Sequence, residues 1–583
     1  MSLFVVFIVA AVLLGAGAML SPAWRSAQPR VALAATLCLA LILGGAVFYA
    51  EAFAWDTLVV DYLLFALLSG VVLGGTLSTA QARAEARGEQ LSDRDQGWPG
   101  PQDLAFFALV AVAIIIPLVH LPAALGAQGQ ITGFHSLTTL HGESFRSLAP
   151  FDSHNQVIVS PGFHALSAYL SGQLSQPISL IQLSLAAVSV FLLVWLAYDF
   201  GSELRDKRLG RALAIATLMS GGIHLSYLDG HFAELLALLF LKAFLVYALR
   251  FLREFNLADL IAGGLMIGAV VYTSLTVSII AMLGFALLCL LGWARFGADF
   301  TRKSRWGYII GFPLVALLGI SPWLYNNLTL IFPISTSTYP ADLSLLADIV
   351  VGNGLLIIPL AVWGITIALR HPGSLRLVSL LMLLWLALIL ELSLVGFIGK
   401  LFPPIGALVN APNMARHGTI LPLSWFGGLA LLRLWETNLP QNLKRRLRQL
   451  AYPLMAATTL LLLALGFAFE PIVTALRPLL NLPEQTLTRD DYSAMLWLRD
   501  NAPEDAIVLS ADGEGWLPVV AERRAVDFRA VAYFEWDRFK GLVEEQEADY
   551  VFQPSAGADL PDLPLKLVFQ HGEARVYEIP QSR

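Results

Sequence analysis

Charged side chains are scarce in this sequence. Asp, Glu, Lys and Arg make up 14% of its 583 residues, whereas 57% of the residues are hydrophobic and the mean hydropathy is +0.68. A soluble fold has no interior large enough to bury that much apolar surface, so this composition excludes a soluble globular protein. The lipid bilayer has to be the solvent for most of the chain, and we expect membrane lipid, not nucleic acid, among its partners.

Cysteine and the common catalytic motifs are also missing or rare. Cys38 and Cys289 both lie inside apolar runs, so we interpret them as core or lipid-facing residues and not as a disulfide framework. The sequence contains no Walker loop, HExxH, GxSxG or paired CxxC, and no GxGxxG at a strand-to-helix turn. ATP-driven transport, zinc proteolysis and Rossmann redox chemistry therefore have no support in the sequence.

Long apolar runs recur along the first four-fifths of the chain. Roughly 17 to 25 apolar residues are what a helix needs to cross about 30 Å of hydrocarbon, and helices are required because unpaired backbone groups are costly in lipid. We predict a mostly α-helical fold, a polytopic bundle of about fourteen transmembrane spans. The predicted spans are 3–20, 31–53, 57–79, 103–123, 177–199, 210–227, 231–251, 257–275, 277–294, 306–325, 346–369, 374–392, 417–435 and 450–470.

The distribution of Lys and Arg predicts the topology. Nearly all basic residues of the connections fall in every second one, and the alternate connections of the main block hold only Arg146, Lys400 and Arg416. By the positive-inside rule the protein lies in the cell membrane with both termini extracytoplasmic. No Lys or Arg precedes the first apolar run, which favours a retained helix over a cleaved signal peptide.

Three segments follow from the composition. Residues 1–102 form a group of three spans and a cytoplasmic linker, and residues 103–470 form the main block with a long outer loop at 125–176. Residues 471–583, with 20 acidic and 11 basic side chains, form a small soluble extracytoplasmic α/β domain. In this tail we predict helices from Thr488 and over 536–546, and strands over 506–509, 550–552, 565–569 and 576–579.

The long outer loop carries the signature of a helix start. Ser160 supplies a capping side chain and Pro161 suits the first helical position, where its missing N–H is not needed. Apolar residues then recur at helical spacing from Phe163 to Leu174. We predict a short amphipathic helix along the outer face of the membrane.

Ionisable residues gather at the predicted outer face. Most of the ten histidines fall there, together with Glu143 and Asp152 in the long loop. Asp229, His231 and Glu234 stand where the sixth span turns into the seventh, and the last two share a helix face because they are three residues apart. The functional interpretation is an outward-facing cavity with acid–base or metal-ligand capacity; the alternative is that such residues merely favour wet interfaces.

Two cationic positions are unusual. Arg416, beside His417 at the outer start of the thirteenth span, suits a phosphate through bidentate hydrogen bonds, although snorkelling to lipid headgroups is an equal alternative. Lys242 lies near mid-membrane and marks the interior of the bundle, with a structural pair as likely as a functional role. No pair of residues has a specific metal spacing, so the metal, if any, stays unknown.

The sequence resembles the GT-C superfamily of polytopic glycosyltransferases. The resemblance covers most of residues 103–583 and depends on topology more than on a signature. It is carried by the segments 160–166 (SPGFHAL), 229–231 (DGH), 416–422 (RHGTILP), 497–503 (WLRDNAP), 506–509 (AIVL) and 515–518 (GWLP).

This resemblance implies an inverting glycosyltransferase of the cell envelope that takes a sugar from a polyprenyl-phosphate donor on the outer face. Family members carry an Asp early in the first outer loop, whereas residues 126–130 read GAQGQ here. Glu143 or Asp152 then serves as the catalytic base, or the chain has lost transfer activity. The resemblance places Asp229, His231, Glu234, Arg416 and His417 at substrate, with Arg416 at the phosphate, and a divalent metal is a further option.

Two rival functions stay open. A transporter or lipid flippase suits a chain of many spans, but internal repeats with broken helices meeting at the midplane are not evident in the sequence. The second rival function is that of a catalytically inactive scaffold whose acidic tail binds a protein partner. A scaffold needs no cavity, so a cavity between the long loop and the spans would separate it from an enzyme.

Overall fold

The structure is a computed structural model of the full chain. It describes residues 9, 13, 15, 31–53, 101–120, 125–141, 147–148, 152–156, 160–254, 256–296, 307–331, 340–354, 356–370, 375–406, 409–436, 487–511, 515–528, 536–556, 560 and 564–580. The predicted spans 57–79 and 450–470 and the candidate base Glu143 lie outside these described residues, as does the span 3–20 apart from residues 9, 13 and 15.

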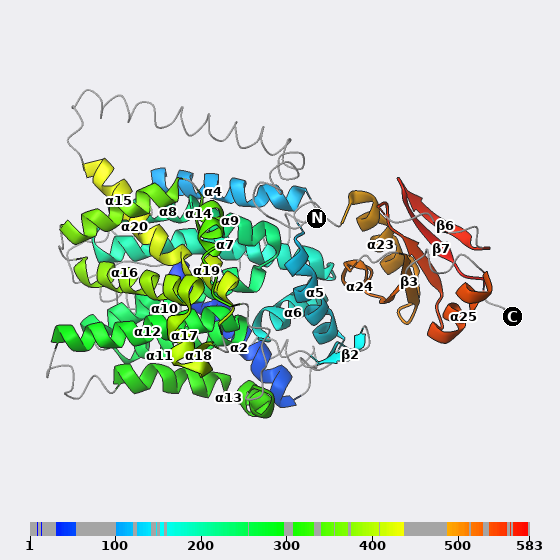
Figure 1. Ribbon diagram of the computed structural model, residues 1–583, viewed down its shortest axis with the longest axis horizontal. Helices are drawn as coiled ribbons and strands as arrows, with labels where there is room; N and C mark the ends of the chain where they lie inside the picture. Colours follow the sequence, from blue (N-terminus) through cyan, green and yellow to red (C-terminus); the bar gives the residue numbers. More distant parts are fainter. Residues whose placement is uncertain are drawn as a thin grey trace, which may run out of the picture.

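The membrane block is a bundle of helices that run side by side (Figure 1). The longer of its described helices are α2 (Val31–Phe53), α4 (Pro101–Val119), α7 (Ile178–Leu204), α8 (Lys207–Leu218), α9 (Gly221–Asp229), α10 (Phe232–Glu254), α11 (Leu257–Thr273), α12 (Leu275–Phe296), α13 (Phe312–Ile331), α14 (Leu345–Asn353), α15 (Ile357–Arg370), α16 (Arg376–Leu390), α19 (Ala411–Gly418) and α20 (Ile420–Glu436). Four shorter helical segments of the described chain lie between them: η4 (Gly307–Gly311), η5 (Glu391–Val395), α17 (Phe397–Leu401) and α18 (Pro403–Gly406).

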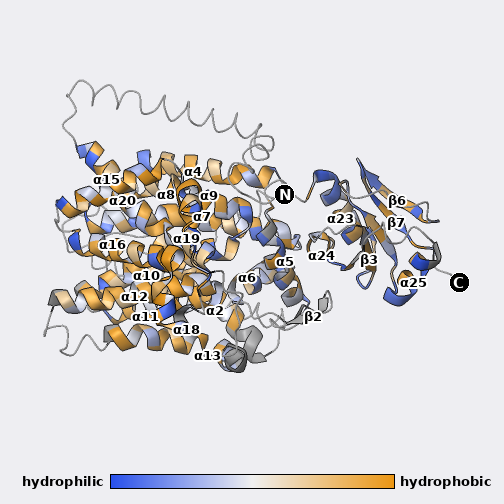
Figure 2. Cartoon of the chain, viewed as in Figure 1, coloured by the Kyte–Doolittle hydropathy of each residue, from blue (hydrophilic) through white to orange (hydrophobic). Residues whose placement is uncertain are grey.

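Several predicted spans appear as helices with nearly the expected bounds, among them α2, α7, α10 and α12. In the described part of the chain, five helices are long and apolar enough to cross a membrane, or six if a bent pair is counted as one span. Apolar side chains dominate these helices, whereas hydrophilic residues are frequent in the domain beside the bundle (Figure 2). The prediction of a mostly α-helical membrane protein is confirmed, whereas the number of spans stays a prediction.

Two predicted spans are not single helices. The span at 210–227 breaks into α8 and α9, and the span at 346–369 breaks into α14 and α15, which meet at 95°. The span predicted at 417–435 corresponds to α20, and a break at Thr419 separates α20 from the preceding α19. The breaks were missed because an apolar run does not reveal that its helix is interrupted. The Asn353 side-chain amide at the end of α14 donates a hydrogen bond to the Thr419 hydroxyl at 3.0 Å. This bond connects the break after α14 with the break before α20.

The long outer loop contains more structure than its sequence suggested. It holds α5 (Ala127–Leu140), a hairpin of β1 (Ser147–Leu148) and β2 (Asp152–Gln156), and α6 (Gly162–Leu174). The prediction for α6 is wrong in two respects: Pro161 itself is the N-cap without a side-chain hydrogen bond, and the first turns are buried, not spread on the membrane face. Close packing of α6 against α5 and α2 explains this burial.

The tail domain, residues 487–580 in the described part, is a small α/β fold. Its sheet has the order β4-β3-β5-β7-β6, formed by β3 (Ile507–Ala511), β4 (Arg524–Phe528), β5 (Tyr550–Gln553), β6 (Lys566–His571) and β7 (Ala574–Glu578), with β3 parallel to β4 and β5 and the β7 pairs antiparallel. The helices are α23 (Arg489–Asn501), α24 (Leu517–Ala521) and α25 (Trp536–Gln546). The predicted helices and four strands are confirmed, including the Thr488 capping box; β4 and α24 were missed.

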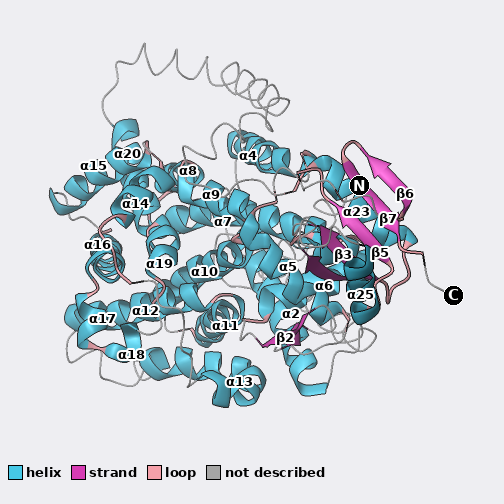
Figure 3. Cartoon of the chain, turned by 45° about the vertical axis from the view of Figure 1, so that its right-hand side comes forward, coloured by secondary structure: helices cyan, strands magenta, loops and turns pink. Residues whose placement is uncertain are grey.

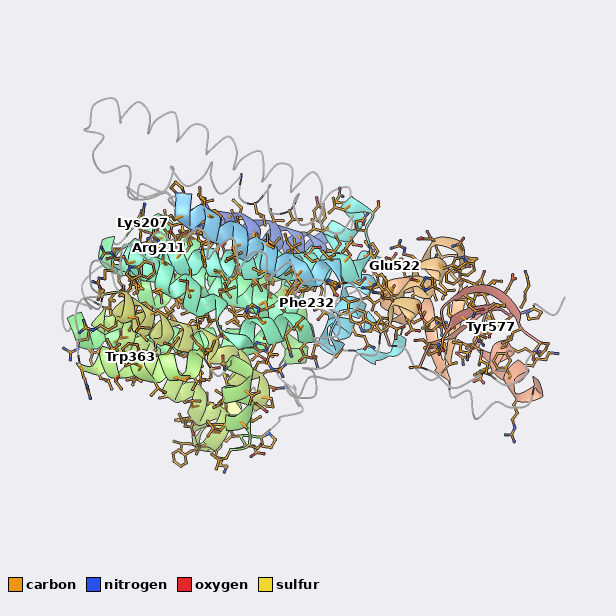
Figure 4. The ribbon with its side chains drawn as sticks, turned by 90° about the horizontal axis from the view of Figure 1, so that it is seen from above. Lys207, Arg211, Phe232, Trp363, Glu522 and Tyr577 are labelled. Carbon is orange, nitrogen blue, oxygen red and sulfur yellow. The ribbon has the colours of Figure 1, made fainter. Side chains whose placement is uncertain are left out.

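The tail domain stands at one end of the bundle, beside α5 (Figure 3). Lys207 and Arg211 lie at the opposite end, and Phe232 lies nearer the tail (Figure 4). The Arg211 guanidinium bonds the buried Asp103 carboxylate at 2.5 Å, which holds α8 to α4 there. The bundle therefore has a basic end and a tail end; which of them faces the cytoplasm stays a prediction from the positive-inside rule.

Candidate active site

A cavity of about 230 Å³ opens at the tail end of the bundle. Its walls come from α5, from the start of α6, from the turn into α10 and from the junction of α11 with α12. The lining side chains that matter for chemistry are His135, His164, His231, Glu234, Thr132 and Asn413. Glu234 is the only carboxylate among the described residues that line it.

A glycine turn sets the geometry of the Asp229–His231 motif. Helix α9 ends at Asp229, and Gly230 follows with φ of 90°, a conformation that a side chain rarely adopts. The His231 amide then donates to the Ser226 carbonyl at 2.9 Å. The turn sets Asp229 Oδ2 and His231 Nε2 3.2 Å apart, both on buried side chains.

Arg416 reaches this turn from α19, although it lies far away in the sequence. Its Nη1 donates to Asp229 Oδ2 at 2.6 Å and lies 2.8 Å from His231 Nε2. The remaining ring nitrogen of His231 is Nδ1. That nitrogen faces Glu234 Oε2 at 3.7 Å. The predicted residues Asp229, His231, Glu234 and Arg416 therefore form one connected group.

His417 completes this group and adds a candidate metal ligand to it. The ring centroids of His417 and His231 are 4.9 Å apart, and His417 Nδ1 lies 3.3 Å from the Ser226 hydroxyl. Nε2 of His417 is buried and has no hydrogen-bond partner in the described part of the chain. Ligand atoms of His231, Glu234 and His417 all lie within 4.8 Å of one another. Two imidazoles and a carboxylate suit zinc or a similar divalent metal, so these residues fit a metal that the sequence had left unknown.

A second pair of histidines, His135 and His164, stands across the cavity. Their ring centroids are 5.1 Å apart, and His164 Nδ1 donates to the Thr132 carbonyl at 3.2 Å. Burial lowers the pKa of His135 to about 4, and burial together with the neighbouring His135 lowers the pKa of His164 to about 3. Both rings are therefore neutral at neutral pH and offer hydrogen bonds without charge. Both are among the histidines predicted at the outer face, and no specific role for either followed from the sequence.

The candidate bases from the outer loop are not among the described residues of this cavity. Asp152 lies on β2, whose backbone pairs with β1, and Glu143 falls outside the described residues. The region where the family pattern expects an acid forms the first turn of α5. There a Cβ on Gly126 would lie 2.2 Å from the Asp229 carbonyl carbon. Close packing against the Asp229 backbone thus leaves no room for a side chain at Gly126. The assignment of Glu143 or Asp152 as the base stays a prediction.

Lys242 is buried on α10, as expected for a bundle-interior residue. It borders a separate small cavity with Phe200, Met382 and Trp425, and no residue of the Asp229 group lines that cavity.

The bundle, its cavity and the tail domain together define a polytopic helical membrane protein. The structure is similar to that of ArnT from Cupriavidus metallidurans in the apo state, with a TM-score of 0.54 and 12% identity over 82% of this chain and 97% of that chain. Archaeal oligosaccharyltransferase AglB from Archaeoglobus fulgidus, in complex with an inhibitory peptide and a dolichol-phosphate, gives a TM-score of 0.45 and 14% identity over 77% of this chain and 69% of that chain. No family model and no curated protein matches the sequence.

Proposed function

We propose that this protein is an inverting membrane glycosyltransferase that transfers a sugar from a polyprenyl-phosphate donor at the outer membrane face. The fold it shares with ArnT supports the class of enzyme. The observation that carries the proposal is the joined group of Asp229, His231, Glu234 and Arg416, of which His231 and Glu234 line a cavity. A scaffold needs neither a cavity nor such a group, which favours catalysis over that alternative.

Arg416 is suited to the leaving phosphate. Its Nη1 is held by Asp229, while its Nε and Nη2 have no hydrogen-bond partner in the described part of the chain. Those two donors form the edge that binds a phosphate in bidentate fashion. Asn413, one turn earlier on α19, lines the cavity, so this face of the helix is within reach of a ligand.

The reaction is a single displacement. An acceptor hydroxyl loses its proton to a carboxylate and attacks the anomeric carbon, while the bond from that carbon to the carrier phosphate breaks and the phosphate leaves with the electron pair. Glu143 or Asp152 takes the proton; Asp229, His231 and Glu234 orient the sugar or the acceptor. A divalent metal held by His231, Glu234 and His417 would supply counter-charge for the phosphate.

Transfer in proteoliposomes supplied with a panel of polyprenyl-phosphate sugars tests the proposal. Arg416→Gln should lower the transfer rate by about a hundredfold, because removing one preorganised donor to developing charge costs roughly 2.7–4 kcal/mol. Lys400→Gln is the matched control, since Lys400 is another predicted outer cation but, unlike Arg416, is not bonded to Asp229 or His231. Equal activity of the two variants would remove Arg416 from the site, and absence of transfer from every donor would refute the function.

The base assignment has its own test. Replacing both Glu143 and Asp152 with the corresponding amides should abolish transfer and leave donor binding intact, because only the proton acceptor is lost. Undiminished transfer by this double variant would show that neither loop carboxylate is the base.

A transporter or lipid flippase is a second candidate, favoured by the broken helices. These breaks are not evident from the apolar runs of the sequence, yet α9 and α14 both begin or end at a break and pack together. Such interruptions are common where transporters bind their cargo. Movement of a labelled polyprenyl phosphate across proteoliposomes, without any sugar transfer, would favour this function over the first.

A further inference from the structure

The tail domain packs into α5 through two glycines. Gly129 and Gly133 are four residues apart and share one face of that helix. A Cβ on Gly129 would lie 3.2 Å from the Trp516 ring, and a Cβ on Gly133 would lie 2.5 Å from Val519 Cγ1. Trp516 and Val519, at the start of α24, are fully buried. The two tail side chains therefore occupy space that exists only because α5 lacks side chains there.

Another face of α5 forms the cavity wall. Gln128, Ile131, Thr132 and His135 recur at helical spacing, and all four line the cavity. The helix is thus a single layer between the tail domain and the proposed active site. Whatever holds α5 in place also sets the shape of the cavity.

The first turn of α5 also touches the Asp229–His231 turn. A Cβ on Gly230 would lie 2.2 Å from the Gly129 amide nitrogen, and a Cβ on Gly129 would lie 3.0 Å from the Phe232 ring. Gly129 therefore lies between Phe232 of the bundle and Trp516 of the tail. A displacement of α5 would separate these two backbones.

We propose that the tail domain is a fixed part of the active site. Trp516 and Val519, seated on the Gly129–Gly133 face, hold α5 against the Asp229–His231 turn and so keep the cavity in shape. Trp516 is a positioning residue, because it touches α5 and does not line the cavity. This inference deepens the proposed function, but the holding of α5 is measurable without any transfer.

The contact depends on shape, not on a hydrogen bond. Trp516 Nε1 is buried and has no partner in the described part of the chain. Phenylalanine would therefore keep most of the packing and remove an unpaired donor, whereas alanine would leave a void. Trp497 provides a matched control: it belongs to the same domain, and its ring stacks on Phe569 at 5.3 Å within the tail.

Hydrogen–deuterium exchange on the purified full chain in detergent tests the proposal. Trp516→Ala should speed exchange of the α5 amides and of residues 226–232 by about tenfold or more, because local opening becomes easier. Trp516→Phe should restore wild-type exchange, and Val519→Ala, which is the milder change, should speed α5 by about threefold. Trp497→Ala should speed exchange only inside the tail.

The outcomes are decisive in either direction. Faster exchange confined to the tail in both Trp516→Ala and Val519→Ala would overturn the proposal, because α5 would then be held by the bundle alone. In the transfer assay Trp516→Ala should raise the acceptor KM and lower kcat, with recovery in Trp516→Phe and little change in Trp497→Ala. A wild-type protein that transfers no sugar would refute the proposed function only, since the exchange measurement would still decide this inference.

Discussion

The ion pair between Asp229 and Arg416 provides the sharpest test of the site. The Asp229 side chain is 5% exposed, and its Oδ2 serves both Arg416 at 2.6 Å and His231 at 3.2 Å. Its Oδ1 has no partner in the described part of the chain. Asp229→Asn keeps the shape of this residue and removes its charge, and Arg416→Gln does the same from the other side.

The expected magnitude follows from burial. Removing one partner of a buried pair costs about 3–5 kcal/mol, because the other charge stays buried and uncompensated. The Arg416 side chain is 32% exposed and keeps part of its hydration. We therefore expect each single substitution to lower the free energy of unfolding by about 2–3 kcal/mol. The double variant should fall short of the sum by about 1–3 kcal/mol, since both substitutions remove the same interaction.

The assay is unfolding of the purified chain in detergent, followed by tryptophan fluorescence for the wild type, the two single variants and the double variant. Lys566 and Glu578 serve as the control pair, because their side chains are 72% and 43% exposed. Their cycle should give a coupling of about 0.2–1 kcal/mol, as exposed pairs do. A coupling between Asp229 and Arg416 no larger than this would refute the reasoning that the buried pair organises the site.

Three further expectations can be checked on the same preparation. Gly126→Ala should lower the free energy of unfolding by about 1–3 kcal/mol through overpacking against the Asp229 backbone, whereas Gly319→Ala, with open space at its Cβ, should not destabilise. His135 and His164 bind their proton in the unfolded state near pH 6.5 but in the folded state only at about 4 and 3, so stability should be complete above pH 6.5 and fall as the pH drops toward 4. A double His135→Gln, His164→Gln variant should flatten this profile; an unchanged profile would contradict it. His417→Ala should weaken binding of Co²⁺, read from its visible spectrum, by about tenfold or more, and equal binding would remove His417 from the metal site.

Much of the fold was predictable from the sequence because a bilayer imposes strong rules. Apolar runs of membrane length have to become helices, so α7, α10 and α12 appear close to their expected bounds. The tail followed from local chemistry: the Thr488 capping box starts α23, and period-two patterns mark its strands. Helix α5 was missed because Gly, Thr and Gln dilute its pattern, although the Gly129–Gly133 spacing was a readable signal of close packing.

The sequence by itself determined that most of this protein lies in lipid and which residue types gather at its predicted outer face, because hydropathy and charge act locally along the chain. The meeting of Arg416 with Asp229, 187 positions apart, was decided only by the tertiary structure, as was the seating of Trp516 on α5. Such contacts depend on where helices break and how closely backbones approach. Those features arise from packing between distant segments, and no single stretch of sequence contains them.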